Sequence, residues 1–141
     1  MTIQSLEAAR PALLMLQATL LQAERRERER MLGRMALGAW YAAVLEDPGL
    51  AWLRPLGQLV ADLDAAMDDA VRSETPLTPE AIAAFTSQAR ACLVPGPRYL
   101  ALLQEYPDVV FAHRDAVRAL PPVRPPGRDG EAPGDRSPGA R

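Results

Sequence analysis

Apolar residues recur at intervals of three and four along nearly every segment before residue 121. No segment shows sustained alternation of apolar and polar residues with a period of two. This spacing places apolar side chains on one face of an α-helix and predicts an all-α protein. Leu13, Leu16 and Leu20 form the first apolar stripe, in a helix expected to start after Ser5 or near Pro11.

The charged segment 24–30 interrupts this stripe, and apolar residues return over 31–45. Gly33 and Gly38 lie within the second apolar stretch, and each lowers helix stability by about 1 kcal/mol relative to Ala. The pattern therefore leaves open whether 6–46 forms one long helix or two helices with a break near Gly33.

Turn and capping residues divide the rest of the chain. Asp47-Pro48-Gly49 predicts a turn, and a helix over 50–72 is expected after it. Thr78-Pro79 predicts the start of a third helix, with shorter helices over 98–106 and from Pro107 onward. The second helix is expected to bury Leu53, Leu56, Val60, Leu63, Met67 and Val71, and the last to bury Val109, Val110, Ala116, Val117 and Leu120. The predicted fold is an all-α antiparallel hairpin or bundle of about four to six helices.

Residues 121–141 differ in composition from the rest, with six prolines, four glycines and no aromatic residue. Ordering a backbone costs about 1–2 kcal/mol per residue, and this segment has few apolar side chains to offset that cost. We therefore predict a helical domain over 1–120 and a disordered C-terminal tail over 121–141.

Charge is distributed unevenly, with a net charge of +2 over 1–45 and of −5 over 46–74. If the turn at 47–49 joins two antiparallel helices, facing residues have numbers that sum to about 96 or 97. Arg28 then faces Asp68 and Asp69, and Arg34 faces Asp62. The charge map thus predicts that the basic segment pairs with the acidic helix of the same chain.

The segment 24–30 contains four arginines and three glutamates. Arginine suits phosphate binding, so a nucleic-acid-associated regulator that uses the Arg25–Arg30 face is one alternative function. The overall net charge of −2 and the sequence pI near 5.4 disfavour nucleic acid as a partner. Two i,i+4 pairs, Glu24 with Arg28 and Arg25 with Glu29, favour a solvated or partner-paired helix face instead.

Few residues suggest chemistry. The acidic run over 62–69 lacks the glycine and terminal glutamate of an EF-hand loop, which favours a solvated acidic face. His113 is the only histidine and is expected to be packed or at the core boundary, while Cys92, the only cysteine, is expected to be a small core residue. An enzyme centred on His113, with Tyr99 or Tyr106, is a second alternative. We expect no catalytic or metal-ligating residue and no cofactor.

The function predicted from these features is a non-catalytic protein–protein interaction module: a small subunit, an accessory factor or a homodimer. The first apolar stripe extends beyond the expected hairpin, so either a partner or the C-terminal helices must cover it. The candidate interaction surface comprises Leu13, Leu16, Leu20, Arg25, Arg28 and Arg30. A membrane-surface protein that uses the apolar face of 11–21 is a third alternative.

The sequence also predicts a cytoplasmic protein. One cysteine cannot form an internal disulfide, and no apolar run is long enough for a transmembrane helix. The N-terminal segment carries Glu7 against Arg10, which is not the positive start of a signal peptide.

Overall fold

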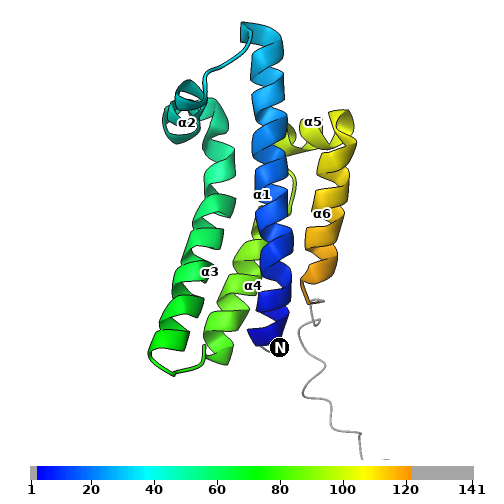
Figure 1. Cartoon of the computed structure of the whole chain (residues 1–141). Helices are drawn as coiled ribbons and strands as arrows, with labels where there is room; N and C mark the ends of the chain where they lie inside the picture. Colours follow the sequence, from blue (N-terminus) through cyan, green and yellow to red (C-terminus); the bar gives the residue numbers. More distant parts are fainter. Residues whose placement is uncertain (1–2, 122–141) are drawn as a thin grey trace, which may run out of the picture.

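The computed structural model describes residues 3–121, which contain six α-helices, one 3₁₀ segment and no strand (Figure 1). The predicted all-α fold is confirmed. Four of the helices run up, down, up and down as a bundle, and two short ones lie at its upper end. The bundle consists of α1 (Ile3–Leu32), α3 (Arg54–Arg72), α4 (Pro79–Cys92) and α6 (Pro107–Ala119). The tail predicted to be disordered lies, apart from Pro121, outside the described residues.

The first helix, α1, begins earlier than expected and passes through Pro11 without ending. The turn before that proline is held because Leu6 and Ala9 are fully buried. The helix ends at Leu32, and Gly33 follows with a φ of +84°, a left-handed conformation that glycine adopts without a steric penalty. The structure thus decides between the two alternatives for 6–46: there are two helices, with the break at Gly33.

The short helix α2 (Leu37–Glu46) leads into the expected turn, which is longer than the sequence indicated. Asp47 accepts a hydrogen bond from the backbone N–H of Gly49 at 2.7 Å and caps a 3₁₀ segment, η1 (Pro48–Leu53). The helix predicted over 50–72 therefore starts at Arg54, as α3.

The predicted register between the basic and acidic segments is wrong. Arg10 of α1 forms an ion pair with Asp64 of α3, so facing residues sum to 74 rather than to 96 or 97. Arg28 pairs with Asp47, and Asp68 pairs with Arg72 on its own helix. The reason is that α2 and η1 lie between α1 and α3, so these two helices are antiparallel but are not joined by a tight turn.

The later helices follow the predicted boundaries closely. Thr78 caps α4 by accepting a hydrogen bond from the backbone N–H of Ala81 at 3.1 Å, which confirms the predicted helix start. The helix α5 (Pro97–Glu105) crosses the upper end of the bundle and turns into α6, which descends beside α1 (Figure 1).

The core is built around α1. Its buried side chains alternate steps of three and four residues: Leu6, Ala9, Leu13, Leu16, Leu20 and Ala23. On α6, Val109, Ala112 and Ala116 are buried, and the small alanines permit close packing of helices. Three side chains predicted to face inward are instead exposed: Val71, Val110 and Val117. Val71 lies in the last turn of α3, beyond its last buried residue, Leu63, and on α6 the neighbouring Val109 and Ala116 occupy the buried positions.

Among residues 3–121, no helix combines the length and apolar character needed to cross a membrane.

Candidate functional site

The apolar residues of the predicted interaction surface are buried within the protein. Leu13, Leu16 and Leu20 are at most 1% exposed and belong to the main core cluster together with side chains of α6. The C-terminal helices therefore cover the stripe that was expected to extend beyond the hairpin. The core of the apolar face of 11–21 is therefore buried within the chain, whereas Leu14 and Met15 beside it are 38% and 62% exposed.

The charged segment of α1 is bound into the fold. Glu24 is only 3% exposed, and its carboxylate accepts a hydrogen bond at 2.7 Å from Nε of Arg98 on α5. This bond is the main reason that the pKa of Arg98 is raised above its ordinary value. The expected pairing of Glu24 with Arg28 is wrong, because Glu24 points inward toward α5.

Arg25 and Arg28 fix the segment that leaves α1. Arg25 donates to Glu29 at 3.0 Å, as the sequence predicted, and also to the backbone carbonyl of Met35 at 3.1 Å. Arg28 donates to Asp47 at 2.7 Å, and this bond lowers the pKa of that carboxyl. Both side chains therefore tie α1 to the chain around α2.

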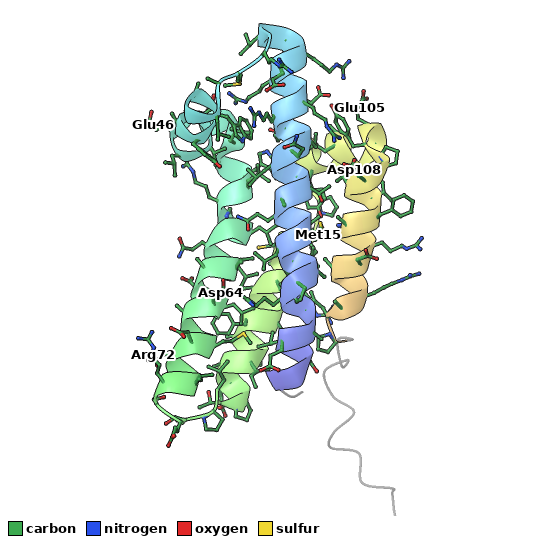
Figure 2. The ribbon with its side chains drawn as sticks, viewed as in Figure 1. Met15, Glu46, Asp64, Arg72, Glu105 and Asp108 are labelled. Carbon is green, nitrogen blue, oxygen red and sulfur yellow. The ribbon has the colours of Figure 1, made fainter. Side chains whose placement is uncertain are left out.

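The other two arginines of the segment join α1 to α6 and to the end of α5. Arg26 lies 3.4 Å from a carboxylate oxygen of Asp108 and 5.9 Å from the ring centre of Tyr106. Arg30 donates to Glu27 at 2.9 Å and to Glu105 at 3.2 Å. Glu105 and Asp108 lie beside the upper part of α1 (Figure 2). All four arginines of 24–30 thus have acidic partners, which supports a structural role for the charged run.

Polar side chains converge near His113, as the enzyme alternative requires. The hydroxyl of Tyr99 on α5 lies 2.6 Å from Nδ1 of His113, and the two rings meet edge to face. Tyr99 also contacts the ring of Trp52 and lines an apolar pocket of about 320 Å³ between η1, α3 and the loop after α4. His113 is partly buried, as predicted for a residue at the core boundary.

The electrostatics of this pocket favour uncharged groups. Burial raises the pKa of Tyr99 and of Cys92, which also lines the pocket, and it lowers the pKa of His113. At neutral pH the phenol and the thiol stay protonated and the imidazole stays neutral, and the Tyr99 hydroxyl and Nδ1 of His113 share one hydrogen bond. The guanidinium of Arg98 at the pocket wall is paired with Glu24. The arrangement can hold an apolar group but does not activate a nucleophile.

The acidic run of α3 is distributed among separate partners. Asp64 pairs with Arg10, facing α1, and Asp62 accepts a hydrogen bond from Gln58 at 2.8 Å (Figure 2). In the part of the chain that the structure describes, no group of three or more His, Cys, Asp or Glu side chains lies close enough to hold a metal ion.

The helix α2 presents a surface that the sequence interpretation missed. Its residues are almost entirely apolar, yet only Trp40 is fully buried. Leu37, Tyr41 and Leu45 are 53%, 58% and 75% exposed, and they recur every four residues. Gly38 and Ala42 form an adjacent exposed row. We call these five residues the α2 face.

Two further exposed apolar side chains lie in the chain before α2. Met31 and Leu32, in the last turn of α1, are 83% and 75% exposed. A segment that is apolar on all sides is ordinarily buried. The signal that could have pointed to this surface is the absence of any charged residue between Arg34 and Glu46.

No family model matches the chain, and the searches of curated proteins and of solved structures found no similar protein.

Proposed function

We propose that this protein is a non-catalytic helical interaction module and that the α2 face is its docking surface. The observation that carries the proposal is the exposure of Leu37, Tyr41 and Leu45 along one side of an apolar helix. Burying apolar surface contributes about 25 cal/mol per Å², so an aligned row of large apolar side chains gains free energy when a partner covers it. The proposal thus keeps the interaction role predicted from the sequence but places the interaction surface on α2 instead of α1.

The remaining sites support this choice. The arginines of the charged segment already neutralise acidic groups of the same chain, and the pocket beside Tyr99 and His113 has a protonated thiol and phenol. Neither arrangement presents a free cation cluster or an activated nucleophile. We propose a cytoplasmic location as well, since the single cysteine has no disulfide partner within the chain.

Site-specific photocrosslinking tests the proposal. A photoreactive phenylalanine analogue is placed at Tyr41 in the full chain, and the chain is irradiated in cells that produce it. The matched controls carry the same analogue at Val71 or Val94, which are 77% and 73% exposed on other elements. We expect a discrete crosslinked product from position 41 and none from the controls. Equal crosslinking from all three positions, or none from position 41, would contradict the proposal.

A further inference from the structure

The shape of the α2 face is complementary to itself. Residues four apart form ridges on a helix surface, and Leu37, Tyr41 and Leu45 are such a ridge. The neighbouring row contains Gly38 and Ala42, whose small side chains leave a groove beside the ridge. A surface with one ridge and one groove can pair with a copy of itself across a twofold axis, since each ridge then enters the other groove.

The charges at the two ends of α2 are also complementary to those of a copy. Arg34 precedes the helix and Glu46 is its last residue, and both are exposed. Within residues 3–121 neither side chain takes part in a salt bridge. Glu46 points away from the body of the molecule (Figure 2).

These charges have the wrong signs for α2 itself. A helix favours acidic groups at its N-terminal end and basic groups at its C-terminal end, whereas here Arg34 lies near the first and Glu46 at the second. An antiparallel second α2 reverses the arrangement. Glu46 of each copy then lies near the N-terminal end of the other α2, and Arg34 near its C-terminal end.

We infer that the partner of the α2 face is a second copy of this chain, docked with the two α2 helices antiparallel across a twofold axis near Tyr41. In this register Leu37 of one copy packs near Leu45 of the other, and Arg34 pairs with Glu46 at both ends. The inference rests on the proposed function, because it names the occupant of the same surface.

The small size of the contact limits the expected affinity of the dimer. A helix of ten residues is about 15 Å long, so an interface centred on α2 falls at the low end of the range for specific protein contacts. We therefore expect a reversible dimer with a dissociation constant in the micromolar range.

Light scattering on the purified full chain, coupled to size-exclusion chromatography, measures the mass over a range from low micromolar to several hundred micromolar. We expect the mass to rise from one chain to two and to stop there. Tyr41→Asp and Leu45→Asp keep the chain monomeric, since both side chains are exposed and a charge there blocks docking rather than folding. Val71→Asp, a matched change at an exposed position of α3, leaves the dimer intact.

Charge reversal tests the antiparallel arrangement. Arg34→Glu and Glu46→Arg each turn two attractive pairs into two repulsive ones, and each raises the dissociation constant about tenfold. An equimolar mixture of the two variants forms a heterodimer, because one chain then carries only acidic and the other only basic groups at the ends of α2. Glu46→Arg also improves the charge at the end of its own helix, so its loss of dimer cannot come from unfolding.

A monomer at every concentration overturns the inference, and so does association beyond two chains or a dimer that Tyr41→Asp leaves unchanged. If the purified chain stays monomeric while position 41 crosslinks to a different protein in cells, the second-copy inference fails and the proposed function stands. If position 41 crosslinks to nothing and the chain is monomeric, both fail.

Discussion

Glu24 shows how a single side chain can change role between sequence and structure. It lies in a charged run that the sequence assigns to a solvated face, yet it is buried against Arg98, 74 residues further along the chain. The i,i+4 spacing predicts only neighbours on the same helix, so Arg25 with Glu29 was predictable and Glu24 with Arg98 was not.

The two partners of this pair are expected to differ in their contribution to stability. Arg98→Met leaves a buried carboxylate without its cation and should lower the free energy of unfolding by about 3 kcal/mol. Glu24→Gln should cost about 1 kcal/mol, because the Arg98 side chain is 43% exposed and can regain water. Urea unfolding monitored by circular dichroism measures both.

The control for this comparison is Arg72→Met, which removes an ion pair whose two side chains are well exposed. Its effect should stay within about 0.5 kcal/mol. Equal costs for the substitutions at Glu24 and Arg98 would contradict the burial of the carboxylate.

The stability of the folded protein is expected to depend on pH because of His113. Burial lowers the pKa of His113 below 6.5, so below that pH the unfolded chain binds a proton that the folded chain resists. Stability is therefore lost as the pH falls through 6.5 toward the lowered pKa of His113 in the folded chain, and His113→Gln should reduce this loss relative to the native chain. Because the chain has one histidine, a proton NMR titration reports its midpoint without overlap. A midpoint at or above 6.5 would contradict the lowering of the pKa of His113 by burial.

At the scale of elements, the boundaries that depend on local chemistry were predictable. Thr78 and Pro79 mark the start of α4, and the prolines at 97 and 107 mark the next two helices. The local sequence does not show how many residues the chain uses to connect α1 to the antiparallel α3. Asp47-Pro48-Gly49 is a good turn signal, but here it starts a 3₁₀ segment after a separate short helix, which shifts the α1–α3 register.

The exposure of α2 was unpredictable for a different reason. A periodic pattern locates the buried face of a helix only when polar residues mark the opposite face. There are none between Leu37 and Leu45, so the sequence does not indicate which face of this helix is buried. The structure resolves the ambiguity by burying Trp40 and leaving Tyr41 outside.

The break between α1 and α2 depends on one glycine. Gly33 has a φ of +84°, and no atom lies within 4 Å of the position that a Cβ would occupy, so Gly33→Ala meets no steric contact but adopts a strained backbone. We expect a loss of about 1 kcal/mol. Gly38→Ala, inside α2 and equally unobstructed, should gain up to about 1 kcal/mol.

Thermal unfolding at concentrations where the chain is monomeric compares the two glycine variants. The opposite signs are the expected result, because only Gly33 has a left-handed backbone. A gain at Gly33 would mean that α1 continues through this position.

At the scale of the whole molecule, α1 is the element around which the others are arranged (Figure 1). The buried stripe of α1 was recognisable from the sequence, but whether α6 or a partner covers it depends on pairing across the chain. Arg26 with Asp108 and Arg30 with Glu105 join α1 to the chain around the start of α6, and these contacts link residues more than seventy positions apart. The candidate surface was misplaced for this reason.

The pocket beside Tyr99 is a product of the same arrangement, since helices α1, α3, α4 and α5 and the segment η1 all contribute to its walls. Cys92 lines it with a raised pKa, so an uncharged maleimide at neutral pH should alkylate the folded chain several-fold more slowly than the urea-unfolded chain. Alkylation should also change the fluorescence of Trp52, which lines the same pocket. The time course of modification by mass spectrometry measures the rates, and equal rates would contradict a sheltered thiol.

The central claim is that α2 is the surface by which this protein meets its partner, a second copy of itself. Hydrogen exchange of the peptide covering 37–46, measured by mass spectrometry at a low and at a high protein concentration, tests this claim most directly. We predict slower exchange of this peptide at the higher concentration and unchanged exchange over α6. Identical exchange of the α2 peptide at both concentrations would contradict the claim.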